Sequence, residues 1–321
     1  MIKIWSELPI ARTKEQIADA ATLAWVVFWG SIVWQLFQFL ASFAEAGRTI
    51  RSGGDNLVLG GAALGDSLAV GVQPDAAGTS VETRRGYADQ LYATLRRSHP
   101  GLRLVKLGCP GETTATMMKG GICAYRGGSQ LAAAVSFLHA HRARVSLVTI
   151  DIGANDADGC VTRLSFGNIA SCLSKSIPQV TTNLTKILTR LRQADPKAHI
   201  IAMSYYLPAL AQWRNGLVGK AVARVSEMVI AGYNVLLNRV YTAYRVRVAD
   251  VFGAFHTADF GQQVTVPGFG TLPRNVAAIC QWTWECVAPP RGPNVHANQA
   301  GYQVIAHAFL HAGASAQRPR Q

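Results

Sequence analysis

Residues 145–156, VSLVTIDIGAND, decide the fold class of this chain. The first eight of them are mostly apolar and rich in β-branched side chains, and they do not alternate between polar and apolar positions. Such a run is typical of a central strand in a parallel sheet that is covered on both faces. The polar residues Asn155 and Asp156 follow at the expected carboxyl end of this strand, where ligands bind in parallel sheets.

Strand-like and helix-like segments alternate on both sides of this stretch. The predicted strands are residues 56–64, 102–107, 145–152, 199–205 and 245–251. The predicted helices are residues 86–98, 130–142, 177–194, 220–244 and 300–312. Strands that alternate with helices predict an α/β fold with a parallel sheet between helical layers. Residues 256–292 show little periodicity, and we expect either a wall or lid beside a site, or a surface loop clamped by a disulfide.

The amino-terminal region carries an export or membrane signal. The chain has 321 residues, enough for one large domain or two small ones, and residues 20–44 include no charged side chain. Twenty-five helical residues can cross a hydrocarbon core of about 30 Å. The run is longer than a usual signal-peptide core, which favours an uncleaved anchor over a signal peptide that is cut after Ala46. A buried or in-plane helix of a cytosolic protein is the third alternative.

These signals predict the organisation of the chain. We expect an amino-terminal flank at 1–19, the anchor or signal peptide at 20–46, a linker at 47–55, one domain at 56–313 and a disordered tail at 314–321. The formal net charge is +13, but Lys and Arg are scattered and form no nucleic-acid-binding motif. The charge therefore indicates a soluble cationic surface or attraction to anionic lipid head groups or cell-wall polymers.

All six cysteines follow the apolar run, which favours disulfides in an oxidising space. Six cysteines allow 15 pairings, and a reduced core remains an alternative. No C-x-x-C pair indicates a metal site. We expect each of three sequence-local disulfides to lie beside a functional loop, and an oxidised domain to lie outside the cytoplasm. The predicted pairs are Cys109–Cys123, Cys160–Cys172 and Cys280–Cys286.

Four short segments together supply the groups that acyl transfer needs. Ser67 follows the first strand and is a candidate nucleophile. The backbone N–H groups of Ser67 and Gly111 and the side-chain amide of Asn155 are candidate donors to an oxyanion. His296 is the candidate base, because it lies in a loop before the last helix.

Each of these residues has a structural alternative. Ser67 could be a helix cap, Gly111 a plain turn glycine and Asn155 an Asx turn. The nucleophile-elbow motif G-x-S-x-G is absent, because position 69 is Ala.

Two further histidine pairs have metal-ligand spacing, but no third ligand lies near either of them, so we predict no metal site. These pairs are His139/His141 and His307/His311.

Taken together, the four segments resemble the SGNH (GDSL) hydrolase family, whose Ser, Gly, Asn and His match Ser67, Gly111, Asn155 and His296. The resemblance covers residues 56–312. It implies a three-layer α/β/α sandwich with a mostly parallel five-stranded sheet, and hydrolysis of esters without a cofactor. The six cysteines and the inserted loop look like the secreted, disulfide-containing actinobacterial branch of this family.

One departure from the family concerns the group that orients the histidine. The family often carries an Asp three residues before it, whereas position 293 here is Pro. We expect the backbone carbonyl of Pro293 to accept the Nδ1–H of His296, which gives a Ser–His dyad. Asp250 or Asp259 could instead fold in as the missing acid, and Asn294 is not the first choice because it is so close in sequence.

The sequence therefore predicts a serine esterase that acts through an acyl-enzyme on Ser67. A membrane-anchored domain that binds glycan or lipid and is catalytically weak is the first alternative, and an acyltransferase to cell-wall sugars is the second. We expect a monomer with a small-molecule, lipid or acylated-glycan ester as substrate and no nucleic-acid partner. The expected location is outside the cytoplasm, held at the membrane by the amino-terminal helix or secreted after cleavage.

Overall fold

One parallel sheet organises the described part of this computed structural model, which comprises residues 60–161 and 166–314 without the side chains of 158–175. The five strands lie in the order β4-β1-β5-β6-β7, and every neighbouring pair is parallel. Among the strands of this sheet β1 comes first in the described sequence, and later strands lie on both sides of it, so the strand order reverses at β1. The strands are β1 (Gly60–Gly65), β4 (Arg103–Lys106), β5 (Val145–Asp151), β6 (His199–Met203) and β7 (Arg247–Ala249).

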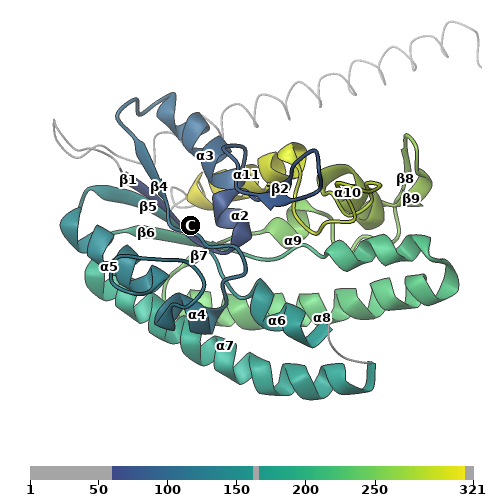
Figure 1. Cartoon of the computed structure of the whole chain (residues 1–321), viewed down its shortest axis with the longest axis horizontal. Helices are drawn as coiled ribbons and strands as arrows, with labels where there is room; N and C mark the ends of the chain where they lie inside the picture. The colour runs from purple at the N-terminus through teal and green to yellow at the C-terminus, as the bar shows by residue number, and fades with distance from the viewer. Residues whose placement is uncertain (1–59, 162–165, 315–321) are drawn as a thin grey trace, which may run out of the picture. The chain divides into compact units, whose positions relative to one another are not determined.

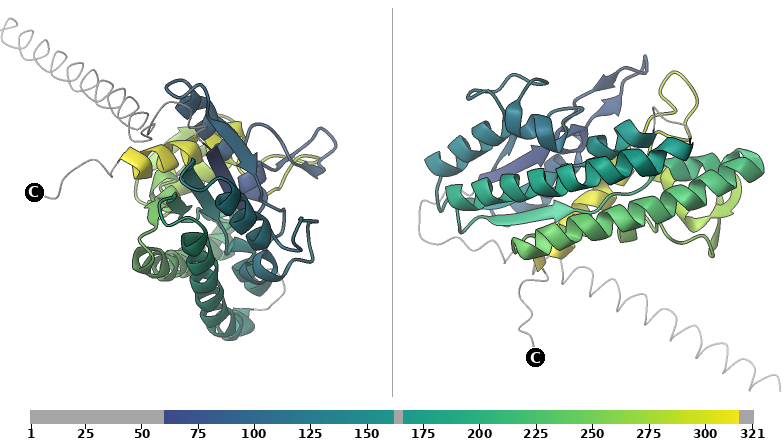
Figure 2. Two further views of the ribbon diagram at one scale, coloured as in Figure 1. Left: turned by 90° about the vertical axis from the view of Figure 1, so that its left-hand side faces the viewer. Right: turned by 90° about the horizontal axis from the view of Figure 1, so that it is seen from below.

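Helices cover both faces of this sheet (Figure 1). On one face lie α3 (Tyr87–Arg96) and α11 (Gln299–Ala314), which pack against each other. On the other face lie α5 (Gln130–Ala140), α7 (Phe166–Ala194) and α8 (Gly216–Ala243), as the side views in Figure 2 also show. The predicted α/β/α sandwich with a five-stranded parallel sheet is confirmed.

Apolar burial on both faces of the central strands explains this arrangement. In β5, Val148 and Ile150 are fully buried, as are Ala63 and Leu64 in β1. Apolar side chains on both faces of a sheet are shielded from water only when helices cover both faces. Between α3 and α11, the ring of Tyr87 stacks on that of Phe309 with centroids 4.7 Å apart.

Short elements follow the strands at the edge of the sheet where their carboxyl ends lie. The helical ones are α2 (Ser67–Val70), α4 (Thr114–Lys119), α6 (Ala154–Val161), η1 (Pro208–Arg214) and α9 (Val251–Ala254). A small hairpin of β2 (Gln73–Pro74) and β3 (Ser80–Val81) extends from the segment after α2.

Two sequence predictions about regular structure were wrong. The helix predicted at 177–194 is the second part of α7, which begins at residue 166. Pro178, which lies near the start of the predicted helix, is inside α7. The segment 256–292, predicted to be irregular, contains the hairpin β8 (Gln263–Val266) and β9 (Gly270–Pro273) and the helix α10 (Arg274–Trp282). Its elements are short, and short elements leave little periodicity in a sequence.

Several predictions fall outside the described residues. The anchor or signal peptide at 20–46, the linker at 47–55 and nearly all of the tail at 314–321 are among them, and so are the side chains of Cys160 and Cys172. Of the helices within 60–161 and 166–314, none combines the length and the apolar character needed to cross a bilayer.

Candidate active site

Ser67 lies at the point where the strand order reverses. It is the first residue of α2, directly after β1, and the neighbouring strands β4 and β5 lead to Gly111 and Asn155. The side chain of Asp66 caps α2 by accepting from the N–H of Leu68 at 3.0 Å. In doubly wound sheets the crevice at such a switch point binds ligands.

A fully buried glutamine fixes the backbone just before Ser67. Gln130 Oε1 accepts from the N–H of Gly65 at 2.7 Å, and Gln130 Nε2 donates to the Gly65 carbonyl at 2.8 Å. The same Nε2 also lies 3.1 Å from Oε2 of the buried Glu112. Gln130 therefore joins the end of β1 to the loop that carries Gly111.

A buried carboxylate fixes the turn from its other side. Asp151 Oδ2 accepts from the N–H of Ala69 at 3.1 Å, and Asp151 Oδ1 accepts from the hydroxyl of Tyr87 at 2.6 Å. Burial raises the pKa of Asp151 well above its ordinary value, and the neighbouring Asp66 raises it further. Hydrogen bonds that Asp151, the last residue of β5, accepts thus hold the first turn of α2.

The Gly111 loop runs beside the nucleophile turn. It begins at Cys109, whose N–H donates to the carbonyl of Gly65 at 3.1 Å. Gly111 has φ +81°, a left-handed conformation that glycine adopts without strain. Among the hydrogen bonds of the described residues, none uses the backbone N–H of Ser67 or of Gly111. Both donors can therefore serve an oxyanion.

Asn155 lies at the start of α6, and its side chain turns toward the same loop. Its Nδ2 donates to the carbonyl of Glu112 at 2.9 Å, which engages one of two amide hydrogens. The next residue, Asp156, accepts from both the N–H and the hydroxyl of Thr114, at 2.8 and 2.7 Å. These contacts tie the loop after β5 to the loop after β4, and no hydrogen bond between described residues uses the second amide hydrogen of Asn155.

His296 comes from the far end of the chain to contact the nucleophile. Its Nε2 lies 2.9 Å from Ser67 Oγ across 229 residues of sequence. Its Nδ1 lies 2.7 Å from Oδ1 of Asn294, an atom that can only accept. The proton of the neutral imidazole therefore resides on Nδ1, and Nε2 is free to accept the proton of Ser67 Oγ.

The acceptor of His296 corrects the sequence-based expectation. Asn294, and not the carbonyl of Pro293, orients the ring, because its amide oxygen also accepts from the N–H of His296 at 3.0 Å and folds back over it. Asn294 Nδ2 donates to Ser80 Oγ of β3 at 3.1 Å. Asp250 caps α9, and Asp259 accepts from backbone N–H groups of its own loop, so neither reaches His296.

Backbone contacts hold the His296 loop. The N–H of Asn294 donates to the carbonyl of Trp284, and the N–H of Trp284 donates to the carbonyl of His296, at 3.2 and 3.1 Å. The hydroxyl of Tyr206 donates to the carbonyl of Val295 at 3.0 Å. Trp284 itself lies within the small loop that the Cys280–Cys286 disulfide closes.

Desolvation sets the protonation state of His296. Burial lowers its pKa from the ordinary value to about 4. The imidazole is therefore neutral above about pH 4 and able to act as a base. A carboxylate at position 294 would oppose this shift, whereas the uncharged amide of Asn294 does not.

Two of the three predicted disulfides are formed. Cys109–Cys123 closes the loop that contains Gly111, and Cys280–Cys286 closes the loop that contains Trp284. Each lies beside a proposed functional segment, as expected. The third predicted pair lies outside the described side chains.

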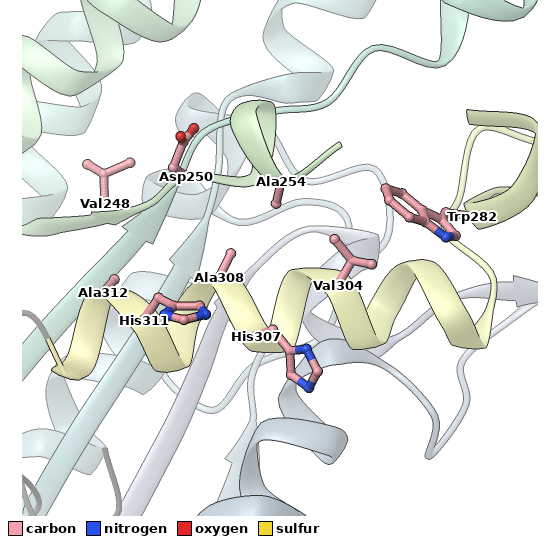
Figure 3. A pocket seen from close by; sticks show the side chains of 9 residues that line it. All are labelled: Val248, Asp250, Ala254, Trp282, Val304, His307, Ala308, His311 and Ala312. Atoms are coloured by element: carbon pink, nitrogen blue, oxygen red, sulfur yellow. The ribbon is translucent and has the colours of Figure 1, made fainter. Parts of the chain in front are cut away.

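A cavity of about 490 Å³ lies apart from Ser67, between β7, α9 and α11. Figure 3 shows Trp282 at one end of it and His307 and His311 along α11. Asp250 also lines it, yet in the described part of the chain no three His, Cys, Asp or Glu side chains are grouped so that they could hold a metal ion. None of the residues that line this cavity belongs to the Ser67 site.

The structure brings the four predicted residues Ser67, Gly111, Asn155 and His296 to one edge of the sheet. The sequence offered Asn294 as a ring acceptor only behind other choices, and it did not indicate Gln130 and Asp151 as supports. Asn294 left a usable signal, since it is a polar residue two positions before the histidine. Gln130 left none, because it is 65 residues from the turn that it holds.

A family model described as GDSL-like lipase/acylhydrolase matches residues 63–304. The chain belongs to this family. Its reaction class is accordingly that of a serine hydrolase of carboxylic esters. The match begins within β1, just before Ser67, and ends within α11, just after His296, so it includes every proposed site residue.

Solved structures of low sequence identity share the fold. An extracellular lipase from Streptomyces rimosus matches with a TM-score of 0.51 and 19% identity, over 78% of this chain and 97% of that chain. A catalytic mutant of an acetylxylan esterase from Geobacillus stearothermophilus matches with a TM-score of 0.50 and 15% identity, over 82% and 96%. No curated protein matches.

Proposed function

We propose that the chain is an esterase in which Ser67 is the nucleophile and His296 the general base. The observation that supports this most is the 2.9 Å contact between Ser67 Oγ and His296 Nε2, together with the acceptor on the opposite ring nitrogen. A serine hydroxyl becomes nucleophilic when such a base removes its proton. A protein that only binds an ester has no need of this arrangement.

The proposed reaction has two stages. Ser67 Oγ attacks the acyl carbonyl while His296 takes its proton, and the oxyanion accepts from the N–H groups of Ser67 and Gly111 and from Asn155 Nδ2. His296 then gives the proton to the leaving alcohol, which leaves an acyl-enzyme. Water attacks this ester with His296 again as base, releases the acid and restores Ser67.

Asn294 is the proposed orienting group of this reaction. Its oxygen selects the tautomer with the proton on Nδ1. Its Nδ2 donates to Ser80 Oγ, which fixes the orientation of the amide with its oxygen toward the ring. It supplies no negative charge to stabilise the imidazolium that forms when His296 takes the proton. We therefore propose a Ser–His dyad with an amide acceptor, which is weaker than a dyad backed by a carboxylate.

Hydrolysis of p-nitrophenyl esters of increasing acyl length tests the proposal, with acetylated xylan and an emulsified triglyceride as further substrates. These two follow the names of the relatives of similar fold, an acetylxylan esterase and a lipase. Wild type is expected to turn over at least one ester, and Ser67→Ala to fall to background. Ser98→Ala, a change at an exposed serine of the α3 end, is the matched control and is expected to retain full activity.

The same assay separates the alternatives. Equal inactivity of wild type and Ser67→Ala on every ester would contradict the esterase and favour a binding domain. Transfer of the acyl group to an added sugar, faster than release of free acid, would favour an acyltransferase. A trapped acyl-enzyme that is found by mass on a residue other than Ser67 would overturn the assignment of the nucleophile.

We also propose that the domain acts outside the cytoplasm, either held at a membrane by residues 20–46 or secreted after cleavage behind Ala46. The uncharged run at 20–44 and the disulfides Cys109–Cys123 and Cys280–Cys286 support this location. Amino-terminal sequencing of exported protein decides between the two forms. Free thiols at all four cysteines in protein taken from cells would contradict it.

A further inference from the structure

One helix carries most of the exposed large apolar side chains in the described residues. Nine such side chains are exposed there, and six of them belong to α8. Leu217 is 86% exposed and Met228 is 71% exposed. An exposed apolar patch of this kind marks an interaction surface more often than scattered single residues do. The six are Leu217, Val218, Val225, Met228, Val229 and Val235.

These six side chains form one face of the helix. Leu217, Met228 and Val235 follow each other at multiples of about 3.6 residues, and Val218, Val225 and Val229 form a parallel row. From Leu217 to Val235 the face extends over about 27 Å at 1.5 Å per residue. It is a long, mostly apolar strip, and by the same spacing Arg224 lies in its first row between Leu217 and Met228. We call it the outer face of α8.

The outer face is not needed to cover the core, because α8 has a second buried face. Ala223, Tyr233 and Leu237 are buried there. The hydroxyl of Tyr233 donates to the carbonyl of Gly153 at 2.7 Å, two residues before Asn155. The helix thus contacts the proposed oxyanion loop with one face and leaves an apolar face exposed to solvent.

Cationic and aromatic side chains flank the amino-terminal end of this face. Lys220 Nζ lies 5.4 Å and the Arg224 guanidinium 5.2 Å from the ring centroid of Trp213. Arg224 also lies 4.8 Å from the ring of Phe260, and Arg214 lies 4.8 Å from that of Phe269. α8 has three basic residues and a single acid, Glu227. Basic and aromatic residues beside an apolar strip are typical of helices that lie on anionic membranes.

We propose that the outer face of α8 docks on the surface of an anionic lipid bilayer, with the helix parallel to the membrane plane. Charge complementarity supports a lipid partner, because Lys220 and Arg224 attract anionic head groups. It disfavours a second copy of the chain, whose outer face carries the same cations and whose net charge is +13. The outer face begins just after η1, which follows the carboxyl end of β6.

An environment-sensitive fluorophore on the full chain tests this docking. The label is attached to the cysteine of a Met228→Cys chain. In the control chain it is attached through Gln193→Cys, an exposed position at the carboxyl-terminal end of α7. With vesicles that contain phosphatidylglycerol, the label at 228 is expected to shift to the blue, and the label at 193 is expected to stay in water. Binding to vesicles through a membrane anchor elsewhere in the chain would affect the two labels equally. It would therefore not produce a blue shift at residue 228 alone.

Three outcomes overturn the proposal. A label at 228 that remains in water with anionic vesicles means that the outer face does not dock. A label that is protected without vesicles at every protein concentration means that another segment of the chain covers the face. Protection that requires a high protein concentration identifies a second copy as the partner.

A charge variant tests the choice of lipid. In the labelled chain, Lys220→Gln with Arg224→Gln is expected to raise the vesicle concentration at half-maximal shift by about thirtyfold. Arg97→Gln with Arg142→Gln removes the same charge from exposed positions outside α8 and is expected to leave that concentration within about twofold. Equal shifts with neutral and anionic vesicles would overturn the electrostatic part of the proposal.

Discussion

The nucleophile half and the base half of the site are built in different ways. Ser67 follows a central strand, and buried side chains from distant elements, Gln130 and Asp151, fix its turn. His296 lies in an irregular loop that Asn294 and Trp284 hold through nearby contacts. The nucleophile half therefore shares its hydrogen bonds with the core. We expect damage there to reduce stability and activity together, and changes in the base half to affect mainly activity, apart from the pH-dependent stability that His296 itself contributes.

Gln130→Leu gives the largest expected effect and tests the first part of this comparison. The leucine leaves the buried N–H of Gly65 and Oε2 of the buried Glu112 without the partners that Gln130 supplies, at about 1–3 kcal/mol each, whereas the Gly65 carbonyl keeps the N–H of Cys109. Urea unfolding is expected to show a loss of about 4 kcal/mol in the free energy of unfolding, with a large loss of kcat/KM. Gln193→Leu at an exposed position is the control and is expected to stay within about 0.5 kcal/mol. A Gln130→Leu protein as stable as wild type would break the comparison.

Asn155→Ala removes a donor to the oxyanion. We expect kcat to fall by about 10²–10³, since that is the usual effect of losing one such donor. The loss of the bond to the Glu112 carbonyl is expected to cost only about 1 kcal/mol in unfolding, because Asn155 is not fully buried. Ester kinetics and urea unfolding check both numbers. A kcat within threefold of wild type would mean that Asn155 is a structural cap.

Asn294→Asp sharpens the comparison on the side of the base. In wild type, burial lowers the pKa of His296 to about 4, so kcat/KM is expected to lose activity only as the pH falls toward 4. A carboxylate beside Nδ1 favours the imidazolium and is expected to raise this midpoint by at least about one pH unit. The pH profile of kcat/KM measures it. An unchanged midpoint would show that position 294 does not control the ring.

The same pKa gives a prediction for folding. The pKa of His296 is lower in the folded than in the unfolded chain, so the folded state disfavours the charged ring. Its contribution to stability is expected to be complete above about pH 6.5 and to be lost as the pH falls from there through about 4. Unfolding of wild type and His296→Gln at several pH values isolates it. A difference between the two that does not change with pH would contradict the lowered pKa.

Ser80→Ala gives the smallest expected effect. It removes the acceptor of Asn294 Nδ2, which is near the surface and can donate to water instead. We expect kcat/KM to fall by about twofold to fivefold, which corresponds to less than about 1 kcal/mol, and stability to stay unchanged. A matched Ser98→Ala protein is the reference. A Ser80→Ala protein that loses a hundredfold in activity would show that β3 is as essential as Gln130.

The two halves also differ in how much of them was predictable from the sequence. Ser67, Gly111 and Asn155 follow strands whose apolar runs are visible in the sequence, and the order of parallel strands brings their ends together. The acceptor of His296 was predictable only in part, because Asn294 is visible as a polar residue two positions away but the sequence does not show that its side chain folds back on the ring. Gln130 was not predictable, since its contact with Gly65 depends on tertiary packing.

The amide at position 294 has one further consequence. A carboxylate behind the histidine would give the proton-transfer pair a negative charge before the reaction begins. Here Ser67, the neutral imidazole and Asn294 begin uncharged, so the attack creates a dipole between the imidazolium and the oxyanion. Dissolved salt acts weakly on a dipole a few ångströms long, because its field falls off well within the Debye length of about 8–10 Å. The chemical step of this enzyme is therefore expected to be nearly indifferent to ionic strength, and any dependence on salt to arise where the protein meets charged surfaces.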